Sequence, residues 1–309
     1  MKKISLLFVL GILLNFSDVF AQQDPQYTQY MYNMNVLNPA YAGSRGTLSL
    51  GMLGRSQWTG VDGSPKTFTF DVHAPLGKSL GAGISVIADE IGPAKEKNIY
   101  ADISYTIRTS DVGRLAFGLK GGVTLLDVNF NDIILPESST NNDPVFDENI
   151  NENSPNFGAG VFYYTDHFYA GFSVPNILRT KHLDKDNIST EASEEVHYFF
   201  TTGYVWDASE NLKIKPSIMV KGVAGAPLSF DLNANFLFYE RFEVGASYRF
   251  DDSISGLVNF AVTPDFRIGY AYDYTISDFS DINPGGSHEI ILLYDINLSK
   301  KNLKSPRFF

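Results

Sequence analysis

The sequence predicts an all-β fold: a transmembrane antiparallel β-barrel of about fourteen strands, preceded by a non-strand segment that packs as a plug or against the rim. Three observations support this prediction. Apolar and polar residues alternate one by one in many short segments. The chain begins with a candidate signal peptide. The long connections between the segments all fall at odd-numbered places, although two odd-numbered connections, near residues 223–226 and 251–253, are also short. Together they indicate an exported protein that crosses a membrane with strands.

The alternation is the strongest of the three observations. In residues 266–275 the apolar side chains occupy every second position: Phe266, Ile268, Tyr270, Tyr272 and Tyr274. Residues 99–107 and 228–238 follow the same pattern. A period of two sends alternate side chains to opposite faces of a sheet. In a closed sheet it produces an apolar outside and a polar inside, which is typical of a membrane barrel.

A tilted strand needs about 9–11 residues to cross a membrane, and most of the alternating segments supply that length. We expect strands near residues 47–57, 66–74, 79–88, 98–108, 114–129, 155–165, 167–175, 195–207, 212–222, 227–238, 241–250, 254–263, 265–275 and 288–298. Pro216 lies inside one of them, which indicates a bulge or a misplaced boundary. Residues 155–175, divided only at Asp166 and His167, leave a different register open. A soluble β-sandwich is the alternative fold.

Composition agrees with a wall that faces lipid. Aromatic residues make up 14% of the chain and charged residues only 19%, whereas charged residues approach a quarter of a soluble domain. Cysteine is absent, which excludes disulfides, thiolate metal sites and a lipid anchor on cysteine. The net charge of −11 argues against nucleic acid as a partner, because its binders carry basic patches.

The N-terminal region divides into two parts. Residues 1–21 are expected to be a signal peptide, with Lys2 and Lys3 before an apolar stretch and cleavage between Ala21 and Gln22. A buried N-terminal helix is the alternative. Residues 22–46 are rich in Tyr, Asn, Gln and Met, and we expect them to fold into the periplasmic mouth as a plug or against the rim. A mobile tail is the alternative here.

The barrel is then assigned to residues 47–298 and a basic periplasmic tail to residues 299–309. With both termini in the periplasm, every odd-numbered connection becomes an outer loop. Long connections are expected at residues 130–154, 176–194 and 276–287, all of them odd-numbered. The tight connections at residues 75–78, 166, 239–240 and 264 are even-numbered. This parity supports both the strand count and the orientation.

The predicted lumen positions carry charges of both signs: Arg55, Asp71, Asp102, Arg108, Lys120, Lys213, Lys215, Lys221, Asp231, Glu243, Arg249, Arg267, Asp273 and Asp295. Ion paths tend to have rings of one sign, so mixed signs favour a closed interior whose walls are cross-linked. An acidic loop containing Asp143, Asp147, Glu148 and Glu152 fits no EF-hand spacing and is interpreted as a solvated loop rather than a Ca²⁺ site.

Catalysis has little support. The chain has five histidines: His73, His167, His182, His197 and His288. His288 is followed by Glu289, and such a pair can serve a hydrolase, but neighbouring residues in a strand point to opposite faces. A nucleophile-elbow motif is absent from the sequence. We therefore predict no catalytic, cofactor-binding or metal-binding residues, and the sequence does not identify partner-binding residues.

Several short motifs resemble the PorP/SprF family of outer-membrane proteins. Asp24 to Met31 and Asn38 to Gly43 resemble the family's N-terminal signature. Further similarities follow in the same order along the whole mature chain: residues 55–58, 63–67, 80–84, Asp89, Gly92, residues 287–290 and residues 305–308. The N-terminal block is the most specific part. The middle strands agree only in pattern.

The resemblance implies a non-enzymatic role in the type IX secretion system of Bacteroidetes bacteria. Family members are outer-membrane barrels. Some are needed for the export or surface attachment of a large adhesin, often one used in gliding, through its C-terminal domain. Others connect the secretion and gliding apparatus to periplasmic proteins. The expected partners are thus a secreted cell-surface protein with a type IX C-terminal domain, other type IX secretion components and outer-membrane lipid.

Two other functions remain open on the sequence. A passive outer-membrane transporter for hydrophobic compounds, similar to the fatty-acid channels, would use a plug containing Asn38, Pro39 and Ala40. Inward apolar residues such as Leu53, Leu126 and Phe199 would contribute to its pocket. The inward charges argue against a continuous apolar path. A general porin is less favoured, because fourteen strands leave less room than the 16–18 strands of porins.

Overall fold

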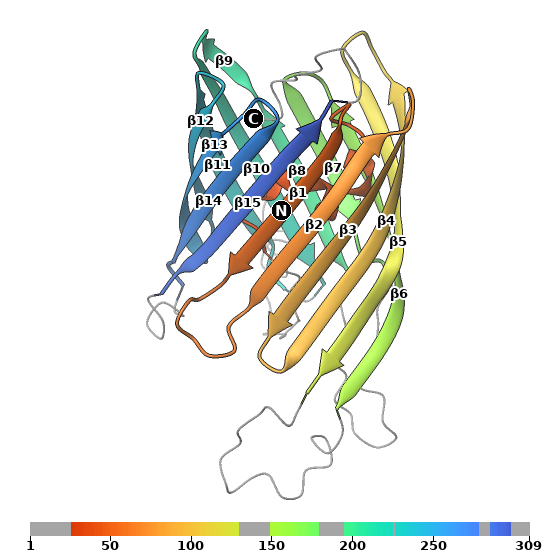
Figure 1. The fold of residues 1–309 in the computed structure, drawn as a ribbon, viewed down its shortest axis with the longest axis vertical. Helices are drawn as coiled ribbons and strands as arrows, with labels where there is room; N and C mark the ends of the chain where they lie inside the picture. The colour runs from red at the N-terminus through yellow and green to blue at the C-terminus, as the bar shows by residue number, and fades with distance from the viewer. Residues whose placement is uncertain (1–25, 130–148, 179–194, 225, 278–284, 298–309) are drawn as a thin grey trace, which may run out of the picture.

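The computed structural model describes residues 26–129, 149–178, 195–224, 226–277 and 285–297. The predicted signal peptide with its cleavage site at Ala21 and Gln22, the basic tail, His182 and the acidic residues Asp143, Asp147 and Glu148 lie outside these ranges. Within them, one antiparallel sheet closes on itself as a barrel, through pairing of β15 with β1 and of β10 with β11 (Figure 1). The predicted membrane β-barrel is confirmed.

The strands are β1 (Leu48–Ser56), β2 (Lys66–Pro75), β3 (Leu80–Ile91), β4 (Ala94–Arg108), β5 (Arg114–Val128), β6 (Ile150–Tyr164), β7 (Phe168–Val174), β8 (His197–Tyr204), β9 (Trp206–Ser209), β10 (Leu212–Val223), β11 (Ser229–Phe238), β12 (Phe242–Arg249), β13 (Ser253–Ala261), β14 (Phe266–Thr275) and β15 (Ser287–Ile296). Since β8 and β9 both pair with β10 in succession, they form one wall strand, and the barrel has 14 strands. The predicted strand count is therefore correct.

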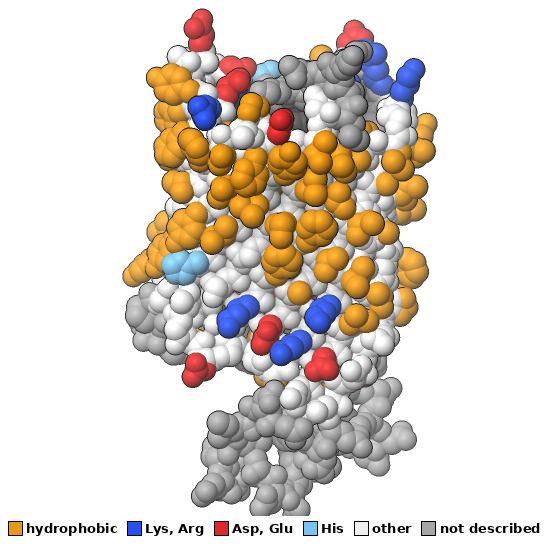
Figure 2. Space-filling view, in the orientation of Figure 1, with side chains coloured by type: hydrophobic (Ala, Val, Ile, Leu, Met, Phe, Trp, Pro, Cys, Tyr) orange, Lys and Arg blue, Asp and Glu red, His pale blue; other side chains and the backbone are white. Residues whose placement is uncertain are grey.

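Side chains alternate between lumen and exterior along each strand. In β13 the buried positions are Ser253, Ser255, Leu257, Asn259 and Ala261, whereas the residues between them are exposed. Figure 2 shows the result on the face in view, a broad belt of apolar side chains across the outer surface. Because strands have a period of two, the side chains next to those of the belt point into the lumen, and most of these are polar.

The ends of β3 and β4 that are joined by the turn at Gly92 and Pro93 extend further than the sequence indicates. A tight turn at Gly92 and Pro93 replaces the expected connection at residues 89–97, and β6 begins at Ile150 rather than at residue 155. Gly92 adopts a positive φ of 55° in this turn. The exposed Lys95 and Lys97 of β4 belong to this extension. Beyond the apolar belt both faces of a strand meet polar surroundings, so the alternation that marks a membrane strand disappears there.

Pro216 lies in β10 without shifting its register. On the side of β8 and β9, the pairs Ser217↔Gly203 and Ile214↔Trp206 have the same register, although the ladder is interrupted between them. The missing N–H of proline is tolerated because the neighbouring wall strand is interrupted beside Pro216, between the end of β8 and the start of β9. The division between β6 and β7 is a simple hairpin, in which the Thr165 N–H donates to the Phe168 carbonyl at 2.8 Å. The alternative register for residues 155–175 is thereby excluded.

Residues before β1 form three short helical pieces: η1 (Tyr30–Tyr32), α2 (Met34–Leu37) and η2 (Pro39–Tyr41). The Asn38 side chain caps η2 by accepting a hydrogen bond from the Ala40 N–H at 2.9 Å, and Pro39 occupies the first helical position. Across the part of the chain that the structure describes, no helix is long and apolar enough to cross a membrane.

Candidate functional site in the barrel lumen

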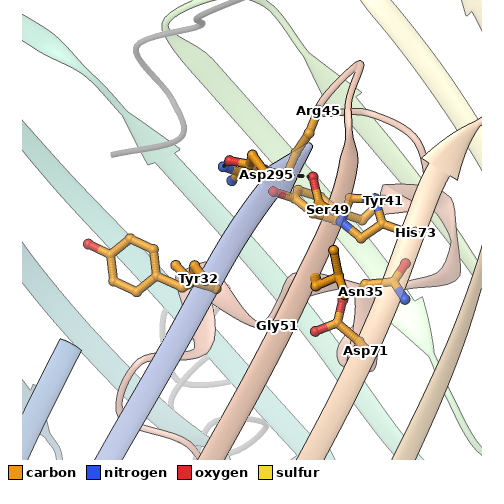
Figure 3. Close-up of a pocket in the computed structure, with 11 residues that line it drawn as sticks. Tyr32, Asn35, Tyr41, Arg45, Ser49, Gly51, Asp71, His73 and Asp295 are labelled. Atoms are coloured by element: carbon orange, nitrogen blue, oxygen red, sulfur yellow. Dashed lines mark hydrogen bonds and ion pairs between the residues drawn. The ribbon is translucent and has the colours of Figure 1, made fainter. Parts of the chain in front are cut away.

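The lumen holds residues 26–46, which we call the N-terminal segment. Tyr30 and Ala40 are completely buried, and neighbouring residues of the segment are nearly so. In Figure 3, Tyr32, Asn35 and Tyr41 lie against the inner faces of β1, β2 and β15. Tyrosine suits this position because its ring fills space while its hydroxyl reaches polar wall residues. Four groups of its contacts with the wall are described in turn.

An ion cluster holds the start of the segment. The N–H groups of Thr28 and Gln29 donate to the two carboxylate oxygens of Glu289 at 2.9 and 2.8 Å. The Thr28 hydroxyl donates to Asp273 at 2.7 Å. Arg55 bridges both carboxylates, at 2.6 Å from Asp273 and 3.3 Å from Glu289. One cation and two backbone N–H groups thus compensate two buried carboxylates. We call this arrangement the Arg55 cluster.

A second buried pair holds the middle of the segment. The Lys120 ammonium donates to the Val36 carbonyl at 2.7 Å and lies 3.7 Å from the Asp102 carboxylate. Both charged side chains are fully buried. The Asn35 side chain donates to the same carboxylate at 3.3 Å. Because α2 is short, its carbonyl groups need outside donors, and Lys120 supplies one.

A third set of contacts surrounds Tyr32 of η1. The Tyr32 hydroxyl donates to Glu243 and accepts from the Asn235 amide at 2.9 Å. The Lys215 ammonium lies 4.5 Å from the centre of the Tyr32 ring, a cation–π distance. Burial, with Glu243 nearby, raises the pKa of the Tyr32 phenol well above its usual value. The hydroxyl therefore stays protonated and remains a donor to Glu243.

The end of the segment is fixed beside the first strand. Arg45 pairs with Asp295 at 2.5 Å, and Ser49 donates to the same carboxylate at 2.6 Å. The Ser104 hydroxyl donates to the Ala42 carbonyl at 2.7 Å. Figure 3 shows Arg45 and Asp295 joined in this way beside Tyr41 and His73. These contacts set the direction in which the chain enters β1.

Glycines in the wall allow the segment to lie directly on the backbone of the strands. A Cβ atom at Gly118 would lie 2.1 Å from the Ala40 nitrogen, and one at Gly81 would lie 2.2 Å from the Ala42 oxygen. Neither position has room for a side chain. At Gly54 of β1, by contrast, an added Cβ would meet nothing within 4 Å.

This difference predicts the effect of filling the glycine sites. We expect Gly118→Val to destabilise the folded barrel by about 1–3 kcal/mol, the usual cost of overpacking, because the backbone of η2 cannot move away from the wall. The temperature at which the purified barrel loses its folded mobility in gel electrophoresis measures this. Gly54→Val is the matched control, and equal temperatures for the two variants would contradict the close packing.

Two small hollows lie between the described part of the segment and the wall. The first is lined among others by Tyr32, Asp71 and Asp295, and the second by Tyr27, Phe199 and Lys221, and each has a volume of about 10 Å³. Such a volume holds about one water molecule. Neither cavity has the size of a substrate pocket.

Most of the predicted lumen charges do line the lumen. Arg55, Asp71, Asp102, Lys120, Lys215, Lys221, Asp231, Glu243, Arg249 and Asp273 are buried. Lys213, Arg267 and Asp295 are partly exposed, and Leu126 is half-buried. Arg108 was placed wrongly: it ends β4, is 67% exposed and pairs with Asp111 of the following turn. Arg108 is an even-numbered residue of β4, like the inward residues Asp102 and Ser104. It is nevertheless exposed, because it is the last residue of the strand and lies at the edge of the barrel.

His288 and Glu289 point to opposite faces, as predicted. The His288 ring lies 2.7 Å from the Tyr270 hydroxyl on the outer surface, whereas Glu289 is completely buried in the Arg55 cluster. Among the described residues, no group of three or more His, Cys, Asp or Glu side chains is placed to hold a metal ion. Glu289, Ser104 and Ser173 also bind the N-terminal segment, although the sequence did not predict them as its wall partners. Ser173 donates to the Leu37 carbonyl at 2.8 Å.

The fold and the interior define a class: a closed membrane β-barrel whose polar lumen contains the protein's own N-terminal segment. The sequence matches the family described as type IX secretion system membrane protein PorP/SprF over residues 19–294. The chain therefore belongs to the PorP/SprF family, an outer-membrane barrel family of type IX secretion and not an enzyme family.

Three solved structures with a similar fold are distant in sequence. The Ralstonia pickettii toluene transporter TbuX is 11% identical, with a TM-score of 0.49, over 92% of this chain and 97% of that one. A Pseudomonas aeruginosa FadL homologue is 13% identical, with a TM-score of 0.45, over 89% of this chain and 95% of that one. The Acinetobacter baumannii outer membrane protein Omp33 is 11% identical, with a TM-score of 0.45, over 82% and 99%. No curated protein sequence matches the chain.

Proposed function

We propose that this protein is a non-enzymatic outer-membrane barrel of the type IX secretion system that binds and anchors a secreted cell-surface protein. It holds the C-terminal domain of that adhesin-like protein and supports its export or surface attachment, including attachment for gliding motility. Other type IX secretion components contact the barrel, and the apolar belt contacts outer-membrane lipid. Membership of the PorP/SprF family supports this proposal.

The observation that carries the proposal is the occupied lumen. In this account the N-terminal segment acts as a plug, because the Arg55 cluster on β1, β14 and β15 and Lys120 on β5 hold its backbone to two separate parts of the wall. Each of these contacts would have to break before a solute or a polypeptide could pass. A barrel built in this way serves as a rigid platform, and its rim is where a partner binds.

The shape of the outer rim favours one side of the barrel for this contact. Strands β4, β5 and β6 each have 15 residues, whereas β7 has 7 and β12 has 8. In Figure 1, β5 and β6 reach further toward the lower end of the barrel than the other strands. That end bears the odd-numbered connections, so it is the outer one. We place the binding surface for the secreted protein on this raised part of the rim.

The placement predicts the effect of inserting a short epitope between Gly92 and Pro93, in the turn between β3 and β4. We expect surface attachment of the secreted protein to fall at least several-fold, because the insertion lies beside the raised rim. Immunoblotting of the cell-surface fraction measures this. The same insertion between Gly77 and Lys78, in an exposed turn at the other end, is the control. Equal attachment with both insertions would show that the secreted protein binds somewhere other than the raised rim.

A passive transporter for hydrophobic compounds is the competing function. It would need the apolar lumen residues Leu53 and Phe199 to line a pocket. Both instead pack in one buried cluster with Tyr27, Tyr30 and Met34 of the N-terminal segment. The space that a hydrophobic solute would need is therefore taken by the protein itself.

Deleting the gene separates the two functions. Loss of one secreted protein from the cell surface, with unchanged uptake of toluene and long-chain fatty acids, is the result that the anchoring function predicts. Impaired uptake with unchanged secretion would contradict it and favour the transporter. Restoring the phenotype with the intact gene controls for effects on neighbouring genes.

A further inference from the structure

The outer surface of the barrel carries a small basic patch at the end that bears the odd-numbered connections. Its members are Lys66, the first residue of β2, and Lys95 and Lys97 near the start of β4, and all three are exposed. We call them the lysine patch. The other exposed Lys and Arg side chains of the described ranges lie in or beside even-numbered connections, at the opposite end: Lys78, Arg108, Arg114 and Arg241.

Strand register places the three lysines close together. Lys66 is opposite Glu90 of β3, and Glu90 is opposite Lys95 of β4. Since neighbouring strands are about 4.8 Å apart, the backbones of Lys66 and Lys95 are about 10 Å apart. Lys97 follows Lys95 by two residues, a rise of about 7 Å, and therefore points to the same face. One ligand can thus contact all three side chains.

Lys97 lies at the border of the apolar belt. The next outward residue of β4 is Ile99, which is 44% exposed. The cross-strand neighbours of Lys97 are Ala88 of β3 and Leu125 of β5. A lysine beside lipid-facing side chains extends its ammonium group to the level of the headgroups. In Figure 2, charged side chains lie directly below the apolar belt.

The protein neutralises only part of this positive charge. Lys95 lies 3.8 Å from Glu90, but both side chains are more than half exposed, so the pair is weak. Within the described ranges, Lys66 and Lys97 form no ion pair. Asp127 of β5 is opposite Lys95. Three lysines against Glu90 and Asp127 leave a formal net charge of +1.

The border of the belt has a different chemistry on β12, β13 and β14. There Tyr248, Ile254 and Tyr274 are opposite one another and exposed. Tyrosine and aliphatic side chains suit a membrane interface whatever the charge of the headgroup. Lysine, in contrast, binds phosphate as a point charge. The lysine patch therefore marks one side of the barrel for an anionic headgroup.

We propose that the lysine patch is a binding site for a phosphorylated glycolipid of the outer leaflet, an inference that rests on the outer-membrane orientation given under the proposed function. The ammonium groups of Lys66, Lys95 and Lys97 bind the headgroup phosphates. The exposed Phe68 and Ile99, the next outward residues of β2 and β4, contact the acyl chains. Lysines spread over about 10 Å suit a headgroup with two phosphate groups better than one with a single phosphate. The lipid then lies beside the raised rim of β4, β5 and β6.

Lipid binding by the purified full-length barrel in an uncharged detergent tests the proposal. The probe is lipid A with two phosphate groups, and native mass spectrometry measures the bound fraction during a titration. Lys66→Gln combined with Lys97→Gln removes two positive charges from the patch. Lys78→Gln combined with Arg114→Gln removes two from the opposite end and is the matched control. All four side chains are exposed, so both variants should fold, and heat-dependent mobility in gel electrophoresis verifies this.

We expect Lys66→Gln with Lys97→Gln to bind lipid A at least about tenfold more weakly, since each lysine near an anionic lipid contributes about fivefold in affinity. The control variant should bind like the unmodified barrel. Lipid A from which both phosphates have been removed should bind the unmodified barrel as weakly as the patch variant binds the intact lipid.

Equal binding of lipid A by the patch variant and the control would overturn the proposal, and so would equal binding of the lipid with and without its phosphates. Displacement of lipid A by inorganic phosphate would reveal a site for free phosphate instead. Tighter binding of phosphatidylglycerol than of lipid A would reveal a phospholipid site, which also contradicts the proposal. None of these results depends on whether the barrel binds a secreted protein, so the failure of either proposal can be recognised separately.

Discussion

Arg55→Met is expected to destabilise the barrel by about 3–5 kcal/mol, because it leaves Asp273 and Glu289 buried without their shared cation. The two carboxylates then repel each other at the level where they hold Thr28. The start of the N-terminal segment should come loose and become sensitive to protease. Urea unfolding of the purified barrel, followed by tyrosine and tryptophan fluorescence, measures the free energy of unfolding.

Two further variants make this prediction specific to the cluster. Arg114→Met removes an exposed arginine at the start of β5 and should leave stability unchanged. Arg55→Met combined with Glu289→Gln removes one of the two negative charges and should regain part of the loss. If Arg55→Met were as stable as Arg114→Met, the Arg55 cluster would not hold the segment.

The second large effect is expected at Lys120. Lys120→Met leaves Asp102 buried without its cation and leaves the Val36 carbonyl without its donor, so we expect a loss of about 3–5 kcal/mol. The middle of the segment should then detach from β5. Purified variant protein in a planar lipid bilayer should conduct ions more often than the unmodified barrel, which we expect to stay closed.

A double variant provides the control for Lys120. Adding Asp102→Asn removes the unpaired charge, so the double variant should be more stable than Lys120→Met alone, with a coupling energy of about 0.5–3 kcal/mol. Purely additive losses would show that the two side chains act independently. If Lys120→Met were destabilised but conducted no more often than the unmodified barrel, the Lys120 contact would stabilise the fold without being needed to close the lumen.

The sequence predicted the wall of the barrel well for a physical reason. Within the apolar belt each strand meets lipid on one face and the lumen on the other, so a period of two is imposed on residues such as those of β13 and β14. The prediction failed where this contrast ends. Lys95 and Lys97 lie beyond the belt in β4, and Arg108 lies at the end of the same strand, where parity no longer separates inside from outside.

The interior was predictable in kind but not in detail. Mixed charges indicated cross-links, yet the partners are far apart in the chain: 261 residues separate Thr28 from Glu289, and 84 separate Val36 from Lys120. Several partners are backbone groups, which have no sequence signal of their own. The glycines at 81 and 118 were visible in the sequence, but only the path of the N-terminal segment explains why a side chain has no room there.

The central claim is that this barrel binds a secreted protein, and affinity purification tests it most directly. The tagged barrel would be extracted from outer membranes with mild detergent and its companions identified by mass spectrometry. The account predicts a large secreted protein with a type IX C-terminal domain, together with other type IX secretion components, and their absence from a mock purification of untagged cells. Recovery of the barrel alone, from cells that still display such a protein on their surface, would contradict the account.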